Sequence, residues 1–209
     1  MNKTILPIAI AIFITPLTVP FTVNSAFAEG IVVGQKLPSV TIEKKGQMVV
    51  ETEVVNDIMV LKEGTGIEYE TFNSDDLTGK IRTVYYMAAR TGIEDINQPY
   101  IDALIAAKLP EFTPDGSYKT TTILNTDDAM WGTTGIAVGR LEDSQRETAY
   151  AFFVIDAEGL GLKKWGLKTK SSAIIVLDRD GKVLYFKDGK LSADEIASTV
   201  ALIQKHLAM

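Results

Sequence analysis

Short runs of apolar residues alternate with polar turn residues along most of the chain. The run from Ile81 to Met87 is rich in β-branched and aromatic residues, which predicts a buried strand. Similar runs predict further strands at residues 119–124, 151–155, 173–177 and 183–186. Shorter runs between residues 30 and 72 predict one or two β-hairpins ahead of this core.

Helices are predicted between and after these strands. Residues 133–146 carry apolar positions at helical spacing, and residues 160–165 fit a short helical turn. Ser192 and Glu195 have the spacing of a capping box, which predicts the start of a C-terminal helix. The apolar face of that helix consists of Ile196, Val200, Ile203 and Leu207.

The helix after the Ile81–Met87 strand has two possible starting points. Thr91 and Glu94 have capping-box spacing, which predicts a helix that begins at Thr91 and is kinked by Pro99. If the helix begins near Asn97 instead, Pro99 lies in its first turn, where a proline is tolerated. We expect the kinked helix, because the capping box otherwise has no role.

The order of these elements predicts an α/β fold with a mixed central sheet flanked by helices. A strand, a helix and a strand form a right-handed parallel unit, and a hairpin and a terminal helix follow. We expect one domain over residues 29–209, with an N-terminal β-hairpin extension at 29–72 and a core at 73–209.

Residues 1–28 have the pattern of a secretory signal peptide. Lys3 is followed by an apolar stretch, and Ala26-Phe27-Ala28 forms an A-x-A cleavage site. The alternative is an uncleaved membrane anchor, which Pro7, Pro16 and Pro20 disfavour as a regular helix. We therefore expect cleavage after Ala28, a periplasmic location and no membrane attachment of the mature chain.

Charge and cysteine content narrow the function classes. Removing 28 of the 209 residues leaves 181, with 20 Lys and Arg against 27 Asp and Glu, because only Lys3 is lost among the charges. The resulting net charge of −7 argues against nucleic acid as a partner, since phosphates demand a basic face. The chain contains no cysteine, so neither disulfides nor thiol chemistry are available to it.

The element order resembles the extended thioredoxin fold of peroxiredoxin-like proteins, and the chain is similar to the YtfJ family of small exported bacterial proteins. The segments that carry the resemblance are Phe72-Asn73-Ser74, Leu77, Gly79-Lys80, Arg90-Thr91, Ala107–Pro110, Thr120–Ile123, Asn125–Ala129, Ser171–Ala173 and Val176–Asp178. The resemblance implies a periplasmic thioredoxin-like protein of unestablished activity. It places Arg90–Ile93 where thioredoxins carry Cys-x-x-Cys, and Ser172 near the position of their cis-proline, which makes Ser172 a candidate ligand-binding residue.

Arg90 and Thr91 lie where the Ile81–Met87 strand is predicted to meet a helix. One hypothesis is an anchor for an anion or a substrate carboxylate, which guanidinium and helix N–H groups would bind together. The alternative, which we favour, is an internal salt bridge from Arg90 to Asp127 or Asp128.

Asn125, Asp127 and Asp128 follow the next predicted strand. They could bind a divalent cation or act as an acid–base pair, but no EF-hand spacing surrounds them. Turn formation and helix capping explain these residue types without a function, so we expect no metal.

Three further residues are expected to have structural roles. His206 falls in the last turn of the C-terminal helix, where a cation complements the helix dipole. Trp131 and Trp165 could line a binding surface, but we expect them to be partly buried packing residues, because large apolar groups in an α/β domain usually contribute to its core.

Two functional hypotheses follow. The first is a non-catalytic binding or adaptor module whose partner is a periplasmic protein or a small anionic ligand. The second is an enzyme with cysteine-independent chemistry at an Arg90–Asp127 corner. We expect the first, because the sequence offers no nucleophile with a base beside it and no cofactor motif.

Overall fold

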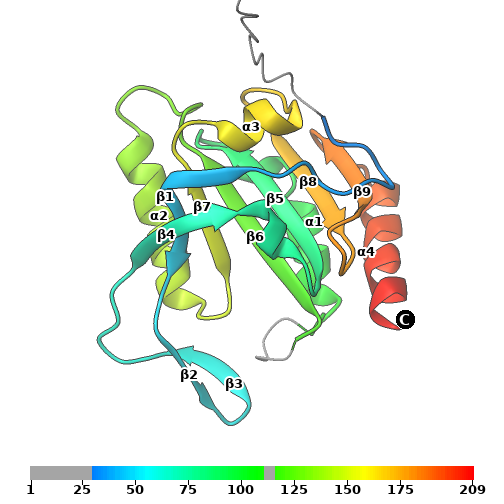
Figure 1. Ribbon diagram of the computed structural model, residues 1–209, viewed down its shortest axis with the longest axis horizontal. Coiled ribbons are helices and arrows are strands. Elements are labelled where there is room, and N and C mark those ends of the chain that lie inside the picture. Colours follow the sequence, from blue (N-terminus) through cyan, green and yellow to red (C-terminus); the bar gives the residue numbers. More distant parts are fainter. Residues whose placement is uncertain (1–29, 111–115) are drawn as a thin grey trace, which may run out of the picture.

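The computed structural model describes residues 30–110 and 116–209, so the predicted signal peptide at 1–28 lies outside the described residues. Seven strands form one sheet in the order β4-β1-β7-β6-β5-β8-β9, and β2 and β3 form a separate hairpin (Figure 1). The strands are β1 (Thr41–Val49), β2 (Thr52–Val55), β3 (Ile58–Leu61), β4 (Glu68–Asn73), β5 (Ile81–Ala88), β6 (Tyr118–Asn125), β7 (Phe152–Asp156), β8 (Ser172–Leu177) and β9 (Val183–Asp188). The helices are η1 (Ser74–Leu77), η2 (Glu94–Ile96), α1 (Gln98–Ala106), α2 (Thr134–Glu147), α3 (Leu160–Trp165) and α4 (Ala193–Leu207).

The sheet is mixed, as the order of elements predicted. Strand β5 runs parallel to β6 and antiparallel to β8, and β6 runs parallel to β7. Strand β1 adds to the outer side of β7 and pairs with β4, both in antiparallel orientation. The α/β fold class and the N-terminal β extension are therefore confirmed.

Helices cover both faces of the sheet, which buries β5 on both sides. On one face, Tyr85 of β5 packs in a cluster with Tyr100 of α1 and Ile203 of α4. Leu141 of α2 packs on the same face, near the carboxyl end of β6. On the opposite face, Tyr86 packs with Trp165 of α3, with their rings edge to face. The carboxyl end of β5 therefore lies between α1 and α2.

The helix after β5 begins later than expected. Helix α1 starts at Gln98 with Pro99 in its first turn, so the expectation of a kinked helix from Thr91 was wrong. Gly92 has a φ of +84°, outside the helical region, and η2 has no side-chain cap. The backbone carbonyl of Glu94 accepts a hydrogen bond from the Tyr85 hydroxyl at 3.1 Å. Thr91 and Glu94 thus have the spacing of a capping box but not its geometry.

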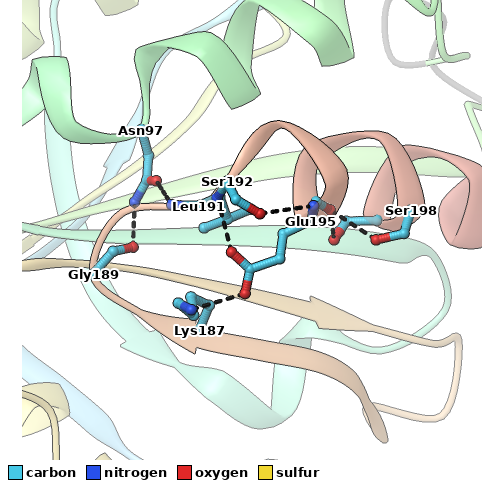
Figure 2. A network of polar contacts seen from close by, with 8 residues as sticks. Asn97, Lys187, Gly189, Leu191, Ser192, Glu195 and Ser198 are labelled. Atoms are coloured by element: carbon cyan, nitrogen blue, oxygen red, sulfur yellow. Dashed lines mark hydrogen bonds and ion pairs between the residues drawn. The ribbon is translucent and has the colours of Figure 1, made fainter.

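The second capping box is present. The Ser192 hydroxyl accepts from Glu195 N at 3.2 Å, and the Glu195 carboxylate accepts from Ser192 N at 2.8 Å (Figure 2). Lys187 also donates to Glu195, and these hydrogen bonds lower the pKa of Glu195 to about 2. His206 lies in the last turn of α4, as expected.

The amide of Asn97 joins the start of α1 to the start of α4. Its nitrogen donates to Ser172 Oγ at 2.8 Å and to the carbonyl of Gly189 at 3.1 Å. Its oxygen accepts from Leu191 N at 3.0 Å, and Figure 2 shows the amide between Gly189 and Leu191. Because Asn97 is fully buried, these bonds connect the two helices in a region that water does not reach.

The two tryptophans differ, contrary to expectation. Trp165 is buried, and its indole nitrogen donates to the carbonyl of Pro38 at 2.8 Å. Trp131 is fully exposed in the loop before α2, so the expectation that it is a packing residue was wrong. Within residues 30–110 and 116–209, no helix is both long and apolar enough to cross a membrane.

Candidate functional site

A cavity of about 390 Å³ lies at the carboxyl end of β5, between the loop that follows β5 and helix α2. Its polar wall contains Arg90, Thr91, Glu94, Thr133, Arg140 and Ser144. Its apolar wall contains Met87, Leu124, Ile136, Ala137 and Leu141. The cavity is of the size at which small-molecule sites are usually found.

Arg90 is fixed on one side by Asp128. Its Nε donates to the Asp128 carbonyl at 2.7 Å and lies 3.3 Å from Asp128 Oδ1. The Asp128 side chain is only 10% exposed, and its other carboxylate oxygen accepts from the backbone N–H of Lys170. The expected salt bridge therefore forms with Asp128, and it holds the Arg90 guanidinium by its inner nitrogen.

Arg90 lines the cavity, and its side chain is 26% exposed. Among the residues that the structure describes, none accepts a hydrogen bond from its two terminal nitrogens. Arg140 lines the same cavity from α2, and its Nη1 lies 4.0 Å from Glu94 Oε1. Two guanidinium groups are thus available at the cavity, one of them oriented by a partly buried carboxylate.

Arg90 does not lie beside the N-terminus of the helix that follows β5, which corrects the prediction made from the sequence. Helix α1 begins only at Gln98, and the Arg90 N–H donates to the carbonyl of Ala88. Thr91 lines the cavity, but it does not cap a helix. Helix α1 therefore supplies no free N–H groups to an anion held at Arg90.

Asn125 and Asp127 do not join Arg90. The Asn125 side chain is buried, and its oxygen accepts from Asp127 N at 3.0 Å, which forms the turn expected of these residue types. The carboxylate of Asp127 is half exposed and lies 3.5 Å from Lys163 Nζ. Neither residue lines the cavity, so the Arg90–Asp127 corner of the second hypothesis does not form.

Ser172 also lies apart from the cavity. Its side chain is buried on β8 and accepts from Asn97 Nδ2, and the described residues contain no cis peptide bond. Of the six candidate residues, Arg90 and Thr91 line the cavity, Asp128 supports it from behind, and Asn125, Asp127 and Ser172 serve turns or buried networks.

The sequence patterns did not reveal Arg140, Ile136 and Leu141, which helix α2 brings to the cavity. A signal was available, because a right-handed connection from β6 to β7 places its helix over the sheet beside the preceding crossover helix. It did not indicate which residues of that helix would face the end of β5.

The groups in and beside the cavity limit the chemistry that the site offers. Burial, followed by the nearby charge of Glu94, raises the pKa of Tyr85 to about 12, so its hydroxyl stays protonated and donates to the Glu94 carbonyl. The cavity contains Thr and Ser hydroxyls without a histidine or other base within hydrogen-bonding distance in the described part of the chain. Among the residues that the structure describes, no group of three or more His, Asp or Glu side chains is arranged to bind a metal.

The fold and the site define a thioredoxin-like protein without thiols, whose cavity at the end of β5 is lined by Arg90. The chain belongs to the family described as "Bacterial protein of unknown function (YtfJ_HI0045)", whose model matches residues 31–206. It is 35% identical over 174 residues to the "Uncharacterized protein YtfJ" of Escherichia coli (strain K12), a match that covers 83% of this chain and 86% of that protein. An uncharacterized protein of Haemophilus influenzae is 34% identical over 180 residues, covering 86% of this chain and 89% of that protein.

Solved structures show the fold. A candidate protein disulfide isomerase from Bacteroides thetaiotaomicron matches 86% of this chain and 92% of its own, with a TM-score of 0.53 and 15% identity. The thioredoxin domain of a thiol-disulfide oxidoreductase from Bacteroides vulgatus has a TM-score of 0.50 and 13% identity, covering 83% of this chain and 98% of that chain. The thioredoxin-like fold is therefore confirmed. Thiol-disulfide exchange requires a cysteine, and this chain contains none.

Proposed function

We propose that this protein is an exported binding module that holds a small anionic ligand in the cavity at the end of β5. The observation that carries the proposal is the position of Arg90, which lines the cavity and is bound to Asp128 through Nε, while its two terminal nitrogens have no acceptor among the described residues. A guanidinium oriented in this way is ready to donate to a carboxylate or phosphate without first losing side-chain freedom.

A catalytic role has less support. The thiol-disulfide chemistry of the structurally similar oxidoreductase requires cysteine, which this chain lacks. The enzyme hypothesis rested on a pair formed by Arg90 and Asp127. In the structure Arg90 pairs with Asp128 instead, and Asp127 lies beside Lys163. Binding without reaction is the role that the remaining groups support best.

Replacing Arg90 with alanine will weaken anion binding by about tenfold or more, because a charge-assisted hydrogen bond to a partly buried anion is lost. The measurement is an NMR titration with acetate and with inorganic phosphate at low ionic strength, observed at the backbone amides of residues 89–94. The matched control is Arg146→Ala, an arginine on the same helix as Arg140 that pairs with Glu142 and Asp143 outside the cavity.

The control variant is expected to bind both anions as the wild type does. Arg90→Lys will recover part of the affinity, since it keeps the charge but not the fork of donors. The proposal is wrong if neither anion shifts these amides, or if Arg90→Ala and Arg146→Ala bind equally well. Thermal unfolding of each variant shows whether a loss of binding reflects a loss of folded protein.

Export is part of the proposal, and the signal-peptide pattern of residues 1–28 supports it. Expressed with its full N-terminus in a bacterium with a periplasm, the chain is expected to appear in the periplasmic fraction with a mature mass that begins at Glu29. An intact mass that still includes residues 1–28 would contradict export with cleavage.

A further inference from the structure

A second hollow follows the cavity at the end of β5 along the same face of the sheet. It has a volume of about 150 Å³, and its floor includes Thr120 and Thr122 of β6. Leu124 of the same strand lines the first cavity. Because residues two apart on a strand point to the same face, the two hollows follow each other along β6 in the gap between α1 and α2.

The second hollow has apolar walls. Ile101, Leu104 and Ile105 of α1 form one side, and Phe153 of β7 lies across from them. The first cavity is polar at its two arginines, 90 and 140, and apolar toward Leu124. We call the two neighbouring hollows together the groove: its cationic groups lie at one end, and the second hollow, whose lining is mostly apolar, forms a trough at the other.

The floor of this groove offers little to a peptide. Strand β6 pairs with β5 on one side and with β7 on the other, so its backbone N–H and C=O groups are used within the sheet. An extended peptide lying here would leave its own backbone groups buried without partners, which is unfavourable for each such group. A chain of methylene groups carries no polar groups and avoids this penalty.

On the basis of the proposed function, we infer that the ligand is an alkyl carboxylate, with its carboxylate at Arg90 and Arg140 and its alkyl chain in the trough between α1 and α2. The apolar side chains around the first cavity agree with this chemistry. Ile136 lines that cavity and is mostly exposed. Met87, a flexible side chain, lines the cavity on the side of β5.

The test compares straight-chain carboxylates of increasing length by calorimetry, below the concentrations at which they form micelles. From acetate to hexanoate, octanoate and decanoate, affinity is expected to rise by about two- to fourfold for each added methylene that is buried. Decanol, which has the same tail and no charge, will bind about tenfold more weakly than decanoate, because it lacks the carboxylate that the arginines bind.

A pair of matched variants locates the tail. Ile105→Glu places a charge in the trough at a residue that is 65% exposed, so folding should tolerate it. It is expected to weaken decanoate binding by about fivefold or more and to leave acetate binding unchanged. The control is Ile58→Glu, a 53% exposed isoleucine on the β2–β3 hairpin outside the groove, which should change neither.

Different results separate the two proposals. If acetate and decanoate bind equally well and Arg90→Ala weakens both, the inference that an alkyl tail occupies the trough is wrong, but the anion site stands. Failure of every carboxylate to bind in an Arg90-dependent way overturns both. If decanol binds as tightly as decanoate, the arginines do not bind the carboxylate as inferred. If trileucine binds more tightly than decanoate, the groove binds peptides and the inference of an alkyl ligand is wrong.

Discussion

Replacing Asp156 with alanine will lower the free energy of unfolding by about 3 kcal/mol or more, the largest loss that we expect from a single substitution in this protein. The Asp156 carboxyl group is completely buried at the end of β7. It accepts from the Tyr86 hydroxyl at 2.9 Å, from Leu160 N at 2.9 Å and from Gly161 N at 2.8 Å. Alanine leaves all three donors without this acceptor, and each buried unpaired group costs about 1–3 kcal/mol.

The measurement is urea unfolding followed by far-UV circular dichroism. Asp127→Ala is the matched control, because Asp127 also follows a strand end but its side chain is half exposed and, within residues 30–110 and 116–209, contacts only Lys163 as an ion pair, at 3.5 Å. It should change stability by no more than about 0.5 kcal/mol. If the two variants unfold at the same urea concentration, the Asp156 network does not stabilise the fold in the way described.

Replacing Asn97 with alanine will cost about 2–4 kcal/mol of unfolding free energy. The substitution removes the donor to Ser172 Oγ and to Gly189 O, and it removes the acceptor for Leu191 N. The Ser172 hydroxyl can rotate toward another partner, but the two backbone groups cannot. Because they lie just before α4, we expect the contact between α1 and α4 to loosen first.

The neighbouring amide provides a control for Asn97. Gln98 makes a single exposed hydrogen bond to Asp102 Oδ1 at 2.9 Å, four residues along the same helix. Gln98→Ala should therefore change stability by about 0.5 kcal/mol or less. Hydrogen exchange at the amides of residues 189–192 reports the local effect, and unchanged protection in Asn97→Ala would contradict the proposed link between the helices.

These two networks join the elements around the cavity. Tyr86 extends from β5 to Asp156, and its hydroxyl also accepts from Leu162 N, so β5, β7 and α3 are joined on one face. Asn97 joins α1, β8 and the start of α4 on the other. The cavity lined by Arg90 lies at the end of β5. Arg90 takes part in neither network.

Local sequence patterns predicted the fold because they report which residues must be buried together. The apolar strand at residues 81–88 and the strand at 172–177 are almost wholly buried, as their composition indicated. The capping box at Ser192 and Glu195 formed because both partners lie within one helical turn. Thiol exchange is excluded by composition alone, because it requires a cysteine that the chain lacks.

The same local reasoning failed at Thr91 and Glu94, although their spacing is identical. Here Gly92 takes a positive φ, and the Tyr85 hydroxyl binds the Glu94 carbonyl from the sheet below. Contacts with the sheet therefore outweigh a capping preference that is usually worth about 1 kcal/mol. Whether a capping pattern forms a capping box therefore depends on the tertiary contacts that its backbone makes.

The sequence by itself determined the α/β architecture, the C-terminal capping box and the lack of thiol chemistry, because these follow from periodicity and residue type. Only the tertiary structure decided that Arg90 pairs with Asp128 and not with Asp127, since the Asn125 turn directs the two neighbouring carboxylates to different partners. It also decided that Arg140 lines the same cavity, 50 positions further along the chain. Such pairings depend on how distant segments pack, and no local pattern records them.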